Sequence, residues 1–197
     1  MRRTSPFLVY SLALLLVLTA AGCKRATEAA APAAAAAPPF ITEQTIKDLM
    51  VNVVDTNADV VWLSVTTVAS EKGLVETRPT NDAEWLRVRQ GAVTLAEAAN
   101  LLMIPGRHVA RPGEKSETPG VELEPSEMEE LINKDRPAFY KHAKALYDAA
   151  MLAVEAIDKR DAGRVFEVGE NIDHACEQCH RNYWYPNEKI PELPVAK

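Results

Sequence analysis

Apolar residues recur at alternating spacings of three and four along four separate stretches, and this pattern constrains the fold more than any other feature of the sequence. The stretches cover residues 43–63, 81–102, 135–157 and 161–183. Such a spacing places the apolar side chains on one stripe of an α-helix, which must be buried against other helices. Joined by mostly short links, the four helices are expected to form an antiparallel four-helix bundle, an all-α fold in one domain of residues 40–197.

Each predicted helix contributes its own apolar stripe to the core. The alanines of the third stripe either pack the helices closely or leave room for a flat cofactor, and both arrangements satisfy the pattern. The four stripes are Ile46, Leu49, Val53, Thr56, Val60 and Leu63; Trp85, Val88, Ala92, Leu95, Ala99 and Leu102; Phe139, Ala143, Leu146, Ala150, Ala153 and Ile157; and Val165, Gly169, Ile172, Cys176, Cys179 and Tyr183.

Residues that can cap a helix stand before three of these helices and before a short helical turn that precedes the third. They are the pairs Asn81–Glu84 and Ser126–Glu129, which have capping-box spacing, Asp135, which precedes Pro137, and Asp161.

Two segments interrupt the helical pattern. Residues 64–78 alternate branched and polar side chains, and they predict a short β-hairpin between the first two helices. Residues 105–125 carry four prolines and three glycines, which predict a long loop of the kind that is often functional or wraps a domain.

The N-terminus has the features of a bacterial secretion signal. A positive start and an apolar run that ends in small residues predict that residues 1–22 are a signal peptide. Gly22-Cys23 resembles a lipobox and predicts lipid attachment at Cys23; the alternative is an ordinary cleavage site before a cysteine. Residues 24–39, rich in alanine and proline, predict a flexible tether. We therefore expect a periplasmic domain, anchored to a membrane as a lipoprotein.

Cys176-Glu177-Gln178-Cys179-His180, near the end of the fourth predicted helix, has the pattern of a covalent c-type haem attachment site. Two thiols three residues apart on a helix can each bond one vinyl group of a haem, while the next residue's imidazole reaches the iron from the same side. A redox dithiol does not require the adjoining histidine, and a zinc site would need further ligands. We therefore expect one haem c, with His180 as the axial iron ligand.

The motif in the last helix, Tyr183 three residues after His180 and the four-helix layout together resemble the class II c-type cytochromes, of the cytochrome c-prime type. The resemblance implies that Tyr183 lies at the haem. It also implies an apolar residue of the first helix that crowds a vacant iron position, for which Leu49 is suited, and it allows a homodimer. The hairpin, the long loop and the Trp184-Tyr185 tail depart from the family pattern; the two aromatic residues are expected to cover the haem edge or to pack under the loop.

Other residues compete for the sixth iron position. If the helices alternate in direction, Ile46, Leu49, Met50, Val53, Met103, Phe139 and His142 lie level with the motif. Met50 is a candidate sixth ligand, although a methionine there also serves as core filler. His142 is a further candidate ligand. Arg181 is a candidate partner of a haem propionate, and the alternative is an exposed arginine near a helix end.

The charge of the chain bears on its partners. The formal net charge is −6, and it becomes −8 when Arg2 and Arg3 leave with the signal peptide. This balance argues against nucleic acid and favours a redox partner with a basic docking face, although the same charge also serves as a solubilising surface. We expect an electron-transfer protein and not an enzyme. The alternative is a five-coordinate haem module that binds nitric oxide or carbon monoxide.

Overall fold

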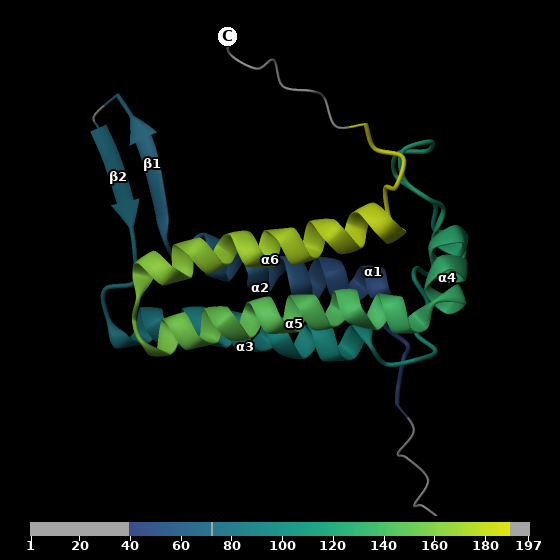
Figure 1. Ribbon diagram of the computed structural model, residues 1–197, viewed down its shortest axis with the longest axis horizontal. Coiled ribbons are helices and arrows are strands. Elements are labelled where there is room, and N and C mark those ends of the chain that lie inside the picture. Colours follow the sequence, from purple (N-terminus) through teal and green to yellow (C-terminus); the bar gives the residue numbers. More distant parts are fainter. Residues whose placement is uncertain (1–39, 72, 190–197) are drawn as a thin grey trace, which may run out of the picture. The chain divides into compact units, whose positions relative to one another are not determined.

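The computed structural model describes residues 40–71 and 73–189, and this part of the chain is mostly helical with one small antiparallel sheet, as predicted (Figure 1). The predicted signal peptide, Cys23 and the tether lie outside the described residues. The helices are α1 (Ile46–Leu49), the π-helical segment η1 (Met50–Val54), α2 (Asp55–Trp62), α3 (Asp82–Leu102), α4 (Pro125–Lys134), α5 (Arg136–Asp158) and α6 (Ala162–Tyr183).

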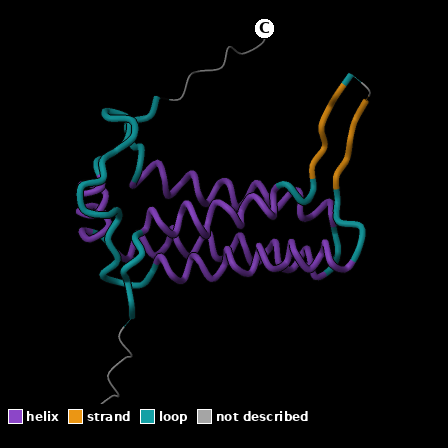
Figure 2. Tube along the Cα trace, turned by 180° about the vertical axis from the view of Figure 1, so that it is seen from behind, coloured by secondary structure: helices purple, strands orange, loops and turns teal. Residues whose placement is uncertain are grey.

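Helices from distant parts of the sequence pack side by side. Helix α3 packs along α5, α5 along α6, and α2 against both α3 and α6 (Figures 1 and 2). The predicted stripes of α3 and α5 are buried along their whole length. Ala150 and Ala153 are fully buried in the core, so these two alanines serve close helix packing.

The first helical run contains a π-turn that moves its buried face by one residue. In η1 the backbone N–H of Asp55 donates to the carbonyl of Met50, five residues earlier. A π-turn inserts one extra residue into an α-helix, so the predicted stripe is wrong beyond this point. The residues buried after Leu49 are Val54, Ala58 and Val61, in place of the predicted Val53, Thr56, Val60 and Leu63, of which Thr56 and Leu63 are exposed.

Three of the predicted helix starts are confirmed and one is wrong. The side chains of Asn81, Asp135 and Asp161 each accept a backbone N–H at the start of their helix, although the Glu84 carboxylate accepts from the N–H of Thr80 and so does not complete a capping box with Asn81. The Ser126–Glu129 capping box does not form. Instead Glu124 and Glu127 make the reciprocal contacts of α4, because Pro125 fixes the first helical position two residues earlier than expected.

The predicted β-hairpin is present between α2 and α3. Strands β1 (Thr66–Ser70) and β2 (Gly73–Thr77) pair in antiparallel fashion, with Val68 opposite Val75. Figures 1 and 2 show the hairpin at the end of the packed helices that lies away from α4.

The long loop between α3 and α4 joins the start of α1 to the end of α6. The N–H groups of Ile46 and Lys47 donate to the carbonyls of His108 and Val109, at 2.8 and 2.9 Å, and so cap the first turn of α1. Near the other end of the loop, the N–H of Leu123 donates to the carbonyl of Trp184 at 2.8 Å. This loop therefore bounds the region where the motif lies.

Candidate functional site

The last two turns of α6 carry the motif, and its three chemically distinctive side chains open on one groove. Cys176, Cys179 and His180 are half-buried, and both thiols are free. The groove has a volume of about 440 Å³, which suits a ligand of cofactor size. The cysteines belong to the apolar stripe of α6 as the sequence predicts, so the helix directs both sulfurs toward the interior.

Apolar side chains from several elements form the walls of the groove. The π-turn and its flanking helices bring side chains to it from the first helical run, and the loop and α4 close it at one end. The apolar lining includes Ile46, Met50, Val54, Ala58, Trp62, Val109, Met128, Ile132 and Phe139. A smaller inner cavity of about 20 Å³ adjoins the motif and is lined by Met50, Leu102, Phe139, His142, Ala143 and Leu146 among others.

Burial controls the protonation of the motif. It raises the pKa of the Cys176 thiol to about 11, with the charges of Asp173 and Asp55 adding to the effect, and raises the pKa of Cys179 to about 12. Burial also lowers the pKa of His180. At neutral pH the two sulfurs therefore keep their protons, and the imidazole is neutral, which is the form that ligates a metal.

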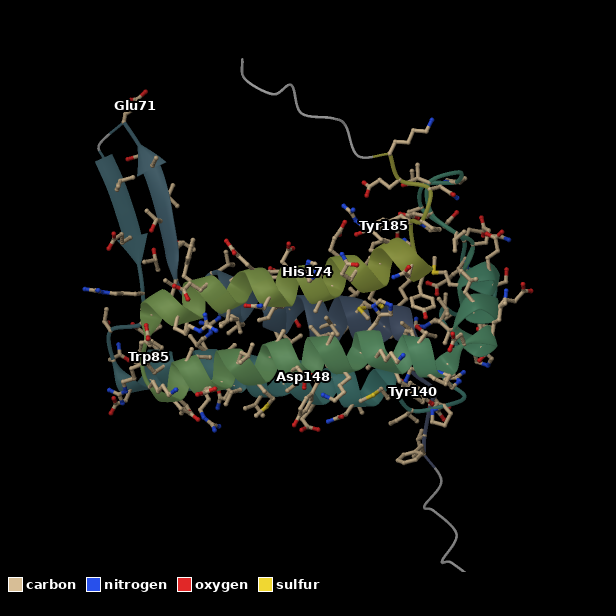
Figure 3. All side chains as sticks on the ribbon, in the orientation of Figure 1. Glu71, Trp85, Tyr140, Asp148, His174 and Tyr185 are labelled. Carbon is tan, nitrogen blue, oxygen red and sulfur yellow. The ribbon has the colours of Figure 1, made fainter. Side chains whose placement is uncertain are left out.

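Two aromatic rings that follow α6 cover His180. The Trp184 ring meets the His180 ring edge-on at a centroid distance of 5.0 Å, and the Tyr185 ring lies 5.8 Å from it. Tyr185, labelled at the end of α6 in Figure 3, donates its hydroxyl to the Glu177 carboxylate at 2.6 Å. Trp184 lines the groove, and its carbonyl accepts the backbone N–H of Leu123, so this tail contacts the loop; that it covers a haem edge stays a prediction.

Met50 and Leu49, both predicted to lie beside the iron, differ in whether they line the site. Met50, at the start of η1, lines both the groove and the inner cavity together with Cys176, Cys179 and His180. Leu49 is buried in the hydrophobic cluster against which Met50 and Cys179 also pack, but it lines neither space.

The remaining predicted neighbours of the motif differ in where they lie. His142 lines the inner cavity, with its Nε2 3.3 Å from the amide nitrogen of Asn182. Tyr183 lines the groove and packs edge-on against Phe139 at 5.4 Å. Arg181 does not line either space; its guanidinium donates to Glu177 at 2.5 Å.

Sequence reasoning missed several residues of the site. Val54 lines the groove where Val53 was predicted, because the π-turn shifts the register. Trp62 also lines the groove, and its indole N–H donates to the carbonyl of Gly169 at 3.0 Å. A tryptophan next to a predicted apolar stripe was the one signal that could have identified it. Lys47 and Lys115 at the groove were not singled out either.

The residues present fit a covalently attached haem. Two half-buried, protonated thiols three residues apart and a neutral imidazole face one largely apolar groove of ligand size. Such an arrangement can bond a flat apolar macrocycle through two sulfurs and offer a nitrogen to its iron. Within residues 40–71 and 73–189, no three His, Cys, Asp or Glu side chains gather in a way that could hold a metal ion by themselves.

No family model matches the chain, and neither a curated protein nor a solved structure is significantly similar to it. Among the described helices, none is both long enough and apolar enough to cross a membrane.

Proposed function

We propose that this chain is a monohaem c-type cytochrome of the class II kind, and that its packed helices are an antiparallel four-helix bundle. The observation that carries the proposal is the opening of Cys176, Cys179 and His180 onto a single apolar groove. The particular role is electron transfer in the bacterial cell envelope. No enzymatic activity is part of the proposal.

The bound haem supplies an iron that alternates between the ferric and ferrous states. The chain's own residues hold and orient it: Cys176 and Cys179 form the thioether bonds, and His180 offers its neutral nitrogen to the iron. Trp184 and Tyr185 restrict the movement of the His180 ring. The apolar walls exclude water, which keeps the surroundings of the iron similar in both oxidation states.

Met50 supports the electron-transfer role over gas binding. Its thioether lines the same groove as His180, and a Met and His pair of axial ligands is typical of electron-transfer cytochromes c. Such an iron has no vacant position for a diatomic gas. The alternative, a five-coordinate module for nitric oxide or carbon monoxide, draws its support from the apolar side chains of Ile46 and Val54 beside Met50.

The proposed location rests on the sequence. Export by residues 1–22, lipid at Cys23 and a tether over 24–39 would hold the domain at a periplasmic membrane surface. The acidic chain would then dock with a redox protein that carries a basic face. A homodimer is compatible with this arrangement.

The test is production of the full chain in a bacterial host that exports proteins and attaches haem c. We expect one haem for each chain, retained after denaturation and acid–acetone extraction. The variant with Cys176→Ala and Cys179→Ala should lose the covalent haem, whereas Cys23→Ser, which removes the third cysteine, should keep it. A colourless wild type, or pigment that remains bonded after both motif cysteines are replaced, would overturn the proposal.

A further inference from the structure

Two lysines line the groove at the end where α1 meets the 105–125 loop. Lys47 belongs to α1 and Lys115 to the loop, and no other lysine or arginine of the described residues lines the groove. We propose that Lys47 and Lys115 bind the two propionate carboxylates of the haem, an inference that rests on the proposed function.

The carboxylates that line the groove differ in their surroundings. Asp55 and Asp173, from α2 and α6, make no ion pair within the described residues, whereas Glu117 and Glu122 lie in the loop that carries Lys115, and Glu117 pairs with Lys47. Asp173 precedes Cys176 by three residues on α6, so the two side chains lie on one face of this helix, and both line the groove. A propionate would be repelled there, and the two ammonium groups at the other side would attract it.

The chemistry of the cofactor leads to the same assignment. In a protoporphyrin the two vinyl groups belong to two neighbouring pyrroles and the two propionates to the other two pyrroles. The edge of the porphyrin that would be bonded to the cysteines is therefore opposite the edge that carries the two propionates. With Cys176 on the same face of α6 as Asp173, the carboxylate edge is directed away from Asp55 and Asp173.

The lysines are available because their present partners hold them weakly. The Lys47 ammonium lies 3.1 Å from the Glu117 carboxylate, whose side chain is 76% exposed. Lys115 lies 3.8 Å from Glu124, beyond hydrogen-bond distance. Exposed ion pairs of this kind contribute little to stability, so they are easily broken. Each ammonium group also has three N–H donors, so it can bind a second carboxylate.

Two nearby charged groups already have partners: Arg181, which could otherwise bind a propionate, and Glu122, which could otherwise bind a lysine. Arg181, the candidate named from sequence, is paired with Glu177 and lies outside the groove lining. The Glu122 carboxylate accepts the backbone N–H groups of Glu117 and Thr118, at 2.7 and 3.0 Å. The two lysines are therefore the cations of the groove lining that can exchange an exposed carboxylate partner for a propionate.

Zero-length cross-linking tests the contact directly. A water-soluble carbodiimide joins a carboxylate to an amine only where the two touch, so treating the haem-loaded full chain should give an amide between a propionate and Lys47 or Lys115. Mass spectrometry of the digested protein should find the haem peptide that contains Cys176 joined to a peptide that contains one of these lysines. Cross-links to other lysines only, or none, would overturn the inference.

The reduction potential gives a second readout. A cation at the propionates stabilises the ferrous state, so the Lys47→Gln, Lys115→Gln double variant should have a lower midpoint potential. Lys159→Gln, which removes a charge outside the groove lining, should leave it unchanged. The Lys47→Arg, Lys115→Arg variant should keep the wild-type potential but lose the cross-link, because a guanidinium keeps the charge and does not couple.

The inference requires both results, and failure of either overturns it. The experiments distinguish failure of this inference from failure of the proposed function. If the wild type carries no covalent haem, the proposed function fails and no cross-link can be sought. If the haem is present but the carboxylates couple elsewhere, or the glutamine variants behave like Lys159→Gln, the cytochrome assignment stands and only the lysine assignment falls.

Discussion

For the proposed cytochrome, the role of Met50 decides between electron transfer and the binding of a diatomic gas. It begins the π-turn and lines the groove beside His180, whereas Leu49, the residue that the family resemblance implies, is buried in a cluster next to Met50 and lines neither the groove nor the inner cavity. This difference between two adjacent residues comes from the rotation of one helical position, about 100°.

Replacing Met50 by Leu should convert a low-spin ferrous spectrum with sharp bands into a broad high-spin one, because the iron loses its sixth ligand. Absorption spectra of the reduced protein would measure this. Met103→Leu is the matched control, since Met103 is part-buried but lines neither the groove nor the inner cavity. Identical spectra for Met50→Leu and the wild type would remove Met50 as a ligand and favour the gas-binding alternative.

Glu177 binds Tyr185, one of the two aromatic residues that cover His180. Its carboxylate accepts from both the Tyr185 hydroxyl and the Arg181 guanidinium, and these contacts lower the pKa of Glu177 below its ordinary value. The sequence predicts Cys176, Cys179 and His180 as site residues from their residue types and spacing, and in the structure the three line one groove. The contact of Glu177 with Tyr185 could not be predicted, because it depends on how the chain turns after Tyr183, whereas its contact with Arg181 is an i,i+4 pair within α6.

At the scale of the elements, the helices α3, α5 and α6 agree with their predicted stripes, and the first run does not. The reason lies in two pairs of identical neighbours: Val53 is followed by Val54, and Val60 by Val61. Either member satisfies the spacing, so the pattern cannot report a shift of one residue. Thr56 in the predicted stripe, against the buried Ala58, was the available warning.

Gly91 of α3 lies close against Val60 of α2. A Cβ at this position would lie 2.7 Å from Cγ1 and 2.9 Å from Cβ of Val60, so Gly91→Ala should destabilise the protein by about 1–3 kcal/mol through overpacking. Gly163→Ala, in α6, is the control. Its Cβ would meet nothing closer than 3.6 Å, and the better helix propensity of alanine should stabilise by up to about 1 kcal/mol. Denaturant unfolding would measure both; equal effects would contradict the packing argument.

Asp48 links α1 to the loop in a way that depends on pH. The backbone N–H of Thr45 is the main cause that lowers the pKa of Asp48 below 3.8, aided by the Thr45 hydroxyl and the Arg111 guanidinium. A lowered pKa means that the stabilisation is fully present above pH 3.8 and is lost as the pH falls through the folded-state value.

Asp48→Asn should therefore lower the thermal midpoint at pH 7, and the difference from wild type should shrink when both are measured near pH 2. Asp59→Asn, an exposed position on α2, is the control and should have little effect at either pH. A difference for Asp48→Asn that is the same at both pH values would contradict the role of the ionised carboxylate.

At the scale of the whole molecule, the haem is expected to contribute to stability as well as to chemistry. The groove is a large apolar space between α6 and the first helical run, and filling it buries surface that water would otherwise contact. The variant lacking both motif cysteines should therefore unfold at a lower temperature than the haem-loaded wild type, as circular dichroism would measure. An unchanged midpoint would indicate that the groove is not where the haem resides.

The prediction of a lipid at Cys23 can be tested separately from the prediction of a haem. Cys23→Ser should move the protein from the membrane fraction to the soluble periplasmic fraction, without changing the haem spectrum. Fractionation followed by absorption measurement would test this. Retention of Cys23→Ser in the membrane fraction would contradict lipid anchoring through this residue.

The β1–β2 hairpin has a practical consequence. Neither strand lines the groove, and the hairpin lies away from α4, at the end of the helices that is far from the loop (Figure 1). Tethering the protein to a solid electrode through a cysteine introduced at Glu71, near the hairpin tip, would leave the groove end facing the solution. An immobilised sample of this kind would exchange electrons with dissolved partners without the electrode surface covering the entrance.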